Sequence, residues 1–210
     1  MKLTIFGASG ATGTTLVQQA LAAGHEVTAV VRDPARLAIQ AHPRLEVVTA
    51  DVLDPAAISP AVDGAGAVLS AVGPGTGAST LRQDSTRSII QAMQKTGTRR
   101  LLIVSGSVVA DEGESAFMHY LLKPLVRRTF LRHVCADMRN AEDEVHRSNL
   151  DWTILRPPSL TSKAARGTYR TAIDRNLPRG FSIPRADLAA YMLTLLDDPS
   201  ASGRHIAIAS

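Results

Sequence analysis

Three glycines at a spacing of three residues, Gly7, Gly10 and Gly13, separate a short apolar run from an amphipathic segment. The run Leu3–Phe6 predicts a strand, and Thr12–Ala23 predicts a helix because its apolar residues recur with helical periodicity. A glycine-rich turn between a strand and a helix lets backbone N–H groups approach a pyrophosphate, which the helix dipole also favours. We therefore predict a dinucleotide-binding turn, with a purely structural turn as the alternative. The predicted turn comprises seven residues: Gly7, Ala8, Ser9, Gly10, Ala11, Thr12 and Gly13.

Short apolar runs alternate with helix-like segments along the rest of the chain. Continuous runs such as Leu101–Val104 are typical of strands that are covered on both faces, as in a parallel sheet. The alternation predicts an α/β fold with a doubly wound parallel sheet in a single domain, residues 1–210. The predicted strands are Leu3–Phe6, Val27–Val31, Leu45–Val48, Ala67–Ala71, Arg100–Val104, Trp152–Leu155 and His205–Ile208.

Helical periodicity predicts three further helices whose apolar stripes pack into the core. One covers Leu81–Lys95, one lies in the long segment between Pro124 and Val145, and one follows Pro184. The stretch 156–183 shows neither helical nor strand periodicity and contains several prolines and glycines. We expect it to be a lid or substrate loop, or an excursion over the surface.

Composition excludes several other classes of protein. Hydrophobic residues make up 45% and charged residues 20% of the chain, as in globular domains. No apolar run reaches the roughly 18 residues of a membrane span, and the N-terminus predicts a strand rather than a signal peptide. Because only 4% of the residues are aromatic, the net charge of +4 does not predict a nucleic-acid surface. The single cysteine, Cys135, excludes an internal disulfide and favours the cytoplasm, and we expect no metal site because no ligands cluster near it.

The residues after the second predicted strand bear on the choice of cofactor. An acidic residue about 20 positions after the glycines would hold a ribose 2′-hydroxyl and favour NAD(H). The chain instead has Arg32, whose guanidinium can bind a 2′-phosphate through two hydrogen bonds, with Arg36 close enough in sequence to contribute. Asp33 is either a competing carboxylate or the cap of the segment that Pro34 opens. We predict that the chain prefers NADP(H) to NAD(H).

Two further strand ends are candidates for the cofactor site. Asp51 and Val52 follow the third predicted strand, where the adenine would lie. Ala71, Val72 and Gly73 end the fourth, where small residues let a cofactor pass close to the backbone. The alternative in both places is an ordinary turn at the end of a strand.

The chain resembles the atypical short-chain dehydrogenases/reductases, and among them the NAD(P)H-binding group that contains biliverdin reductase B, flavin reductases and NmrA-like proteins. Besides the glycine turn, the segments that carry the resemblance are Val31–Pro34, Asp51–Val52, Val104–Ser105, Leu150–Pro158 and Arg185–Ala189. The resemblance implies a Rossmann-type sheet of seven strands ordered 3-2-1-4-5-6-7, with the cofactor across the C-terminal strand ends. It also implies that Ser105 contacts the acceptor or the nicotinamide, against a plain strand-end role, and that Pro157, Pro158 and Ser159 meet the carboxamide.

Ordinary short-chain dehydrogenases place a Tyr-x-x-x-Lys pair on one helix face for proton transfer. This chain has no such pair. Its nearest match, Tyr120-Leu121-Leu122-Lys123, is one residue short and is followed by Pro124, which disfavours helix at the lysine. We expect Tyr120 to line the substrate cleft or to pack, with proton transfer as the alternative. His119 is a candidate proton donor, or else a partly exposed loop histidine.

The missing tyrosine–lysine pair favours acceptors that need hydride but little acid catalysis. We predict an oxidoreductase that transfers hydride from NADPH to a flavin- or quinone-like acceptor, with pocket segments near 106–124 and 159–183. Ser159 stands where some biliverdin-reductase-like members carry histidine, which argues against tetrapyrroles. The alternatives are a non-catalytic NADP-binding sensor and a tailoring reductase or isomerase of a small metabolite. We expect a monomer or weak homodimer, with neither nucleic acid nor membrane as a partner.

Overall fold

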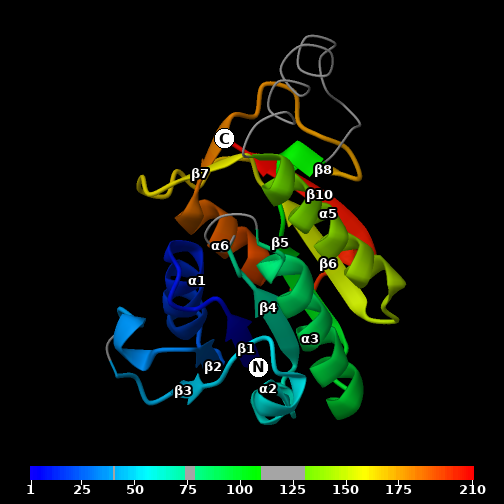
Figure 1. The fold of residues 1–210 in the computed structure, drawn as a ribbon. Coiled ribbons are helices and arrows are strands. Elements are labelled where there is room, and N and C mark those ends of the chain that lie inside the picture. Colours follow the sequence, from blue (N-terminus) through cyan, green and yellow to red (C-terminus); the bar gives the residue numbers. More distant parts are fainter. Residues whose placement is uncertain (40, 74–78, 110–130) are drawn as a thin grey trace.

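The computed structural model of the chain describes residues 1–39, 41–73, 79–109 and 131–210 (Figure 1). Within these ranges one mostly parallel sheet of eight strands forms the middle layer of an α/β fold. Its strands are β1 (Lys2–Phe6), β2 (Glu26–Val31), β3 (Leu45–Thr49), β4 (Ala67–Ser70), β5 (Arg100–Val104), β6 (Asp151–Arg156), β8 (Arg170–Ile173) and β10 (Arg204–Ala209). They lie in the order β3-β2-β1-β4-β5-β6-β10-β8.

Helices cover both faces of this sheet (Figure 1). On one face α1 (Ala11–Ala22) packs against α6 (Arg185–Thr194), and on the other α3 (Leu81–Thr96) packs between α2 (Pro55–Val62) and α5 (Leu131–Arg147). The connections that the structure describes contain the short 3-10 turns η1 (Pro34–Arg36), η2 (Ser107–Val109) and η4 (Pro199–Ala201). No helix in the described ranges combines the length and the apolar character needed to cross a membrane.

The alternation of side chains along β1 divides the core into two clusters. Leu3 and Ile5 are fully buried in the cluster shared with α1 and α6, whereas Phe6 is fully buried in the cluster shared with α2 and α3. Successive residues of a strand point to opposite faces, so both faces of this central strand are apolar. The continuous apolar runs in the sequence therefore mark strands with a helix layer on each side.

The seven predicted strands are all present, and their predicted order is confirmed, with β10 as the seventh. The stretch 156–183 is more regular than its sequence predicts. It contains β8 and a separate two-stranded parallel sheet formed by β7 (Ser159–Thr161) and β9 (Ser182–Pro184). Strand β8 runs antiparallel to β10, with Ile173 opposite Ile206. It thereby covers the edge that a seven-stranded sheet would leave open at β10.

Helix α2 has no counterpart among the predicted helices. Its start nevertheless carries a recognisable signal, because Asp54 accepts hydrogen bonds from the backbone N–H groups of Ala56 (2.9 Å) and Ala57 (3.2 Å), and Pro55 occupies the first turn. Eight residues are too few to show a clear helical period, so only the capping signal was available. The described part of the long predicted helix is α5, and its predicted positions before residue 131 lie outside the described residues.

An aromatic cluster lies near the N-terminal ends of β6 and β10. The imidazole of His205 contacts that of His146 on α5, with their Nε2 atoms 2.9 Å apart, and its ring centroid lies 5.3 Å from that of Trp152. Burial lowers the pKa of His205 below its ordinary value of 6.5, and the nearby Arg156 adds to this effect while Glu142 opposes it. The folded state therefore disfavours a charged imidazole at this position.

The lowered pKa of His205 predicts a loss of stability in mild acid. The unfolded chain takes up the proton at higher pH than the folded chain does. The neutral His205 side chain therefore makes its full contribution to the free energy of unfolding above the unfolded-state pKa of about 6.5. This contribution is lost as the pH falls from there through the folded-state pKa. In urea unfolding between about pH 7.5 and pH 5.5, the free energy of unfolding of the wild type should fall more steeply than that of His205→Asn. His133→Asn, an exposed histidine on α5, is the matched control. Equal slopes for wild type and His205→Asn would contradict the prediction.

Candidate dinucleotide-binding site

A cavity of about 270 Å³ opens at the C-terminal ends of β1, β2 and β4. The sheet continues outward from β1 through β2 on one side and through β4 on the other. Such a reversal of strand order is where open α/β sheets bind ligands. The cavity wall consists of Gly7, Ser9, Gly10, Val30, Val31, Arg32, Arg36, Ala50, Val52, Ala71, Val72, Gly73 and Leu81.

The glycine turn between β1 and α1 is packed so tightly that two of its positions exclude a side chain. Gly7 has a φ of +73°, and a Cβ there would lie 2.7 Å from the backbone carbonyl carbon of Ala71. A Cβ on Gly13 would overlap the carbonyl of Gly7. The turn closes with a hydrogen bond of 2.9 Å from the Gly10 N–H to the Gly7 carbonyl. Gly7 and Gly13 are thus required by the packing of the turn itself, whereas Gly10 faces the cavity.

Helix α1 begins at this turn without a side-chain cap. Gly10 is its N-cap residue, no side-chain hydrogen bond caps the helix, and its first turn carries no acidic residue. The nearby hydroxyl of Thr14 donates instead to the carbonyl of Ala8, at 2.9 Å. The uncapped N–H groups at the start of a helix can bind a phosphate group. The adjacent glycine turn lets the phosphate come close to the backbone. The residues present therefore fit the pyrophosphate of a dinucleotide.

Two arginines line the cavity at the end of β2. Arg32 follows the strand directly, and Arg36 ends the short turn η1. Both are exposed, and neither forms an ion pair with another described residue. The Asp33 carboxylate accepts a hydrogen bond of 3.0 Å from the Ala35 N–H and so caps η1. Of the two roles expected for Asp33, the structure therefore gives it the capping role.

The ends of β3 and β4 contribute mainly apolar and small residues. Val52 lines the cavity, and so do Ala71, Val72 and Gly73. Asp51, predicted at the same place, is not in the cavity wall. Its carboxylate accepts a hydrogen bond of 3.0 Å from the Leu53 N–H within the loop after β3. The contact of Asp51 and Val52 with an adenine remains a prediction.

The ends of β5 and β6 are joined by backbone hydrogen bonds. The Ser105 N–H donates to the Leu155 carbonyl at 2.8 Å, and the Ser107 N–H donates to the Pro157 carbonyl at 2.9 Å. Ser159 starts β7 and is exposed, and neither it nor Pro157 and Pro158 lines the 270 Å³ cavity. The predicted proton donors His119 and Tyr120, like Lys123, lie outside the described residues.

Ser105 instead lines a second, much smaller cavity of about 10 Å³ between the ends of β4 and β5 and helices α3 and α5. Val72 lines both cavities. The other polar residues of the small cavity are Ser70, Arg82, Ser85 and Thr86. Ser70 ends the fourth predicted strand, next to the predicted site residues Ala71–Gly73, whereas Arg82, Ser85 and Thr86 were not singled out from the sequence. The position of Arg82 could have been predicted from helical spacing. It lies seven positions before Ile89 and therefore on the buried face of α3.

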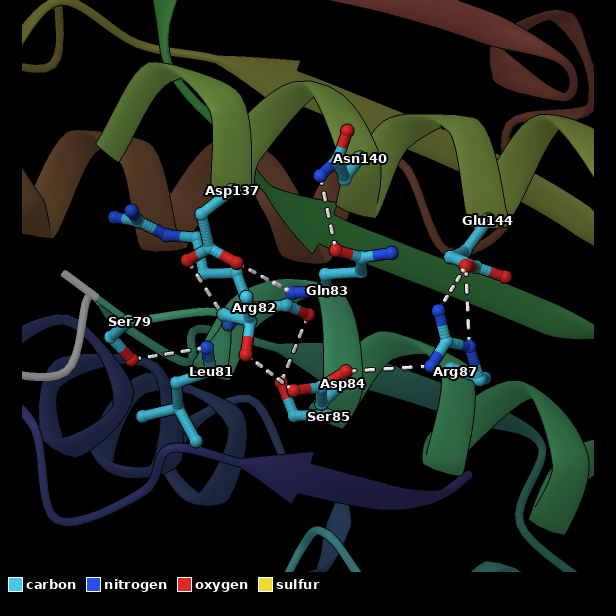
Figure 2. Close-up of polar contacts among 11 residues, drawn as sticks. Ser79, Leu81, Arg82, Gln83, Asp84, Ser85, Arg87, Asp137, Asn140 and Glu144 are labelled. Atoms are coloured by element: carbon cyan, nitrogen blue, oxygen red, sulfur yellow. Dashed lines mark hydrogen bonds and ion pairs between the residues drawn. The ribbon is translucent and has the colours of Figure 1, made fainter. Parts of the chain in front are cut away.

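The first turn of α3 is capped from a different helix. The Asp137 carboxylate of α5 accepts hydrogen bonds from the backbone N–H groups of Arg82 (3.2 Å) and Gln83 (2.9 Å), as Figure 2 shows. Further along, the two helices are joined by the Asn140–Gln83 hydrogen bond and the Arg87–Glu144 ion pair. Burial lowers the pKa of the Arg82 guanidinium, while the charge of Asp137 partly opposes this shift. The cation is thus held in a largely dry place.

Comparison with known proteins agrees with this geometry. The model of the family described as NAD(P)H-binding matches residues 7–199, from the glycine turn to the loop after α6. The chain belongs to the NAD(P)H-binding family. The uncharacterized protein YwnB of Bacillus subtilis (strain 168) is 27% identical to this chain over 202 residues, which cover 94% of this chain and 92% of YwnB.

Solved structures that share the fold of this chain include proteins described as an oxidoreductase and as a reductase. The oxidoreductase ylbE from Lactococcus lactis superposes with a TM-score of 0.83 at 19% identity, covering 100% of this chain and 91% of that one, which shows a common fold. ChuY from Escherichia coli O157:H7, described as an anaerobillin reductase, superposes with a TM-score of 0.80 at 25% identity, covering 100% and 97%. The prediction that the chain belongs to an NAD(P)H-binding family is confirmed.

Proposed function

We propose that this protein is an NADPH-dependent reductase of flavin- or quinone-like acceptors. The observation that carries the proposal is the pair Arg32 and Arg36, which line the nucleotide cavity without an ion-pair partner among the described residues. Two exposed guanidinium groups in the wall of a dinucleotide cavity suit a ligand with an additional phosphate. Asp33, whose carboxylate would disfavour that phosphate, is engaged in capping η1.

The sequence lacks the residues that ordinary short-chain dehydrogenases use to protonate a carbonyl, and this bears on the class of acceptor. No Tyr-x-x-x-Lys pair is available to protonate a carbonyl oxygen. When NADPH is bound it supplies hydride, one hydrogen with two electrons, and leaves as NADP⁺. Flavins and quinones become conjugated anions on receiving hydride, and water can supply the remaining proton. The chain's own contribution is then to bind and orient the two molecules and to exclude competing geometries. The reductase activity ascribed to ChuY supports this class of reaction.

We further propose which molecule the protein acts on, in which oligomeric state and in which compartment. The acceptor is a small molecule, and the protein acts as a monomer or weak homodimer. The single cysteine, Cys135, is buried in α5 as a free thiol, which suits the reducing cytoplasm.

The test is to mix the purified protein with NADPH or NADH and to follow absorbance at the nicotinamide band with FMN, riboflavin or a quinone. A charge-assisted hydrogen bond contributes about 1.5–3 kcal/mol, so we expect kcat/KM for NADPH to exceed that for NADH by about tenfold or more. Mixtures without protein give the uncatalysed rate. Tight NADPH binding without turnover of any acceptor would favour the non-catalytic sensor instead. Equal use of both cofactors would contradict the assigned role of the arginines.

A further inference from the structure

Three buried polar atoms beside the small cavity lack a hydrogen-bond partner among the described residues. One is the Oγ of Ser105, a residue that is only 8% exposed. The other two are the Nε and Nη1 atoms of Arg82. Both residues line the same cavity. Buried polar groups in native proteins are almost always paired with protein or water, so donors concentrated at one place are suited to hold an oxygen atom.

The carboxylate nearest to the Arg82 guanidinium accepts backbone N–H groups instead of the guanidinium. Asp137 is the nearby carboxylate, but its two oxygens accept the backbone N–H groups of Arg82 and Gln83 (Figure 2). The positive charge is thus close to a carboxylate without forming an ion pair with it in the described part of the chain. A buried cation with free donors attracts an anionic oxygen strongly, because the surroundings screen its charge less than water does.

The size and position of the cavity limit what can enter it. Its volume of about 10 Å³ matches a single water-sized group. Val72 lines both this cavity and the nucleotide cavity, so the two lie next to each other. The volume of the small cavity admits a projecting ligand oxygen beside Arg82 and Ser105 but not a ring.

We propose that Arg82 and Ser105 form a subsite for one anionic oxygen of the acceptor, and that this subsite selects quinone-like acceptors. This inference rests on the proposed reductase function. On receiving hydride, a quinone gains one hydrogen and two electrons from NADPH, which becomes NADP⁺, and the negative charge resides on oxygen until a proton arrives from water. The Nε and Nη1 atoms of Arg82 and the Ser105 hydroxyl are donors that could stabilise that charge, as in an oxyanion hole.

The test uses a matched pair of probes and does not depend on turnover. 2-Hydroxy-1,4-naphthoquinone is an anion at neutral pH, and 1,4-naphthoquinone is its neutral counterpart with the same ring system. Binding of each is titrated by its absorption spectrum, with and without NADP⁺. We expect the wild type to bind the anion at least about tenfold more tightly than the neutral quinone. In Arg82→Met, the affinity for the anion should fall by about 30-fold, and the affinity for the neutral quinone should change little. Arg82→Lys should restore part of the loss, because it keeps the charge but not the pair of donors.

Two controls separate this role from a structural one. Arg87→Met on the same helix removes an exposed arginine that pairs with Glu144, and it should leave both probes bound as in the wild type. Arg82→Met should be at least as stable to urea as the wild type, since it removes an unpaired buried charge. Ser105→Ala, which should also weaken the anion selectively, carries the test if Arg82→Met fails to fold.

The outcomes distinguish this inference from the proposed function. Equal affinity of the wild type for the two quinones, or undiminished anion binding by both Arg82→Met and Ser105→Ala, would overturn the subsite even if NADPH reduces quinones. Selective anion binding that depends on Arg82, in a protein that reduces no acceptor, would uphold the subsite and refute the reductase.

Discussion

Replacing Gly13 with alanine is expected to lower the free energy of unfolding by about 2–3 kcal/mol, because overpacking at a rigid backbone contact outweighs the gain in helix propensity. The added Cβ would overlap the Gly7 carbonyl and would lie 2.8 Å from the Cα of Ala8. Neither atom can move freely, since Gly7 itself packs against the backbone of Ala71 and Val72 at the end of β4. Urea unfolding followed by circular dichroism measures the loss.

Gly10→Ala should separate ligand binding from stability. Gly10 has an ordinary φ of −82°, and a Cβ there would have one close neighbour, the Gly7 carbonyl oxygen at 3.2 Å. We expect a loss of stability of about 1 kcal/mol, since alanine is a poorer N-cap than glycine. The methyl group would, however, occupy the cavity wall where backbone and pyrophosphate must approach, and NADPH affinity should fall by about 100-fold. Fluorescence titration with NADPH measures that affinity.

Gly66→Ala is the matched control for both variants. Its added Cβ would make only ordinary contacts, the nearest at 3.5 Å, far from the nucleotide cavity. It should leave stability and NADPH affinity close to those of the wild type. Wild-type affinity in Gly10→Ala would refute a pyrophosphate at this turn, and wild-type stability in Gly13→Ala would refute the tight packing of Gly13 against the turn.

The features that the sequence predicted correctly are those whose cause is local. The spacing of Gly7, Gly10 and Gly13 reflects the geometry of one turn, and the buried strands show as continuous apolar runs. The strand pairings of 156–183 were not predictable in this way. Strands β7, β8 and β9 have three or four residues each, too few to show a period, and β8 forms because the edge of β10 is available to it.

The small cavity shows a second limit of sequence reasoning. Arg82 stands on the buried face of α3, but whether an arginine there is paired or free depends on its neighbours from other elements. Those neighbours are Asp137, 55 positions later, and Ser105, at the end of a different strand. The hydrogen bond of the Asp51 carboxylate with the Leu53 N–H is another contact that the sequence did not predict. The role of a polar residue depends on which of its donors and acceptors are not paired with neighbouring residues in the folded protein.

Arg32→Glu is expected to change the cofactor preference of the protein. Loss of the charge-assisted hydrogen bonds to a 2′-phosphate, together with repulsion from the new carboxylate, should weaken NADPH binding by about 100-fold or more. NADH lacks this phosphate, so its affinity should change by less than about threefold. The fold should tolerate the change, because Arg32 is exposed and forms no ion pair with a described residue. Titration of both cofactors under identical salt conditions measures the effect, since exposed charges are screened by salt.

Arg147→Glu makes the same reversal of charge at the far end of α5 and tests whether net charge alone changes cofactor affinity. It should leave the ratio of NADPH to NADH affinity as in the wild type. If Arg32→Glu weakened both cofactors equally, the arginine would be supporting the cavity wall rather than binding the 2′-phosphate. If Arg32→Glu weakened the binding of neither cofactor, Arg36 would be the remaining guanidinium in the cavity wall. The double variant Arg32→Glu/Arg36→Glu would then decide whether any 2′-phosphate site exists at the end of β2.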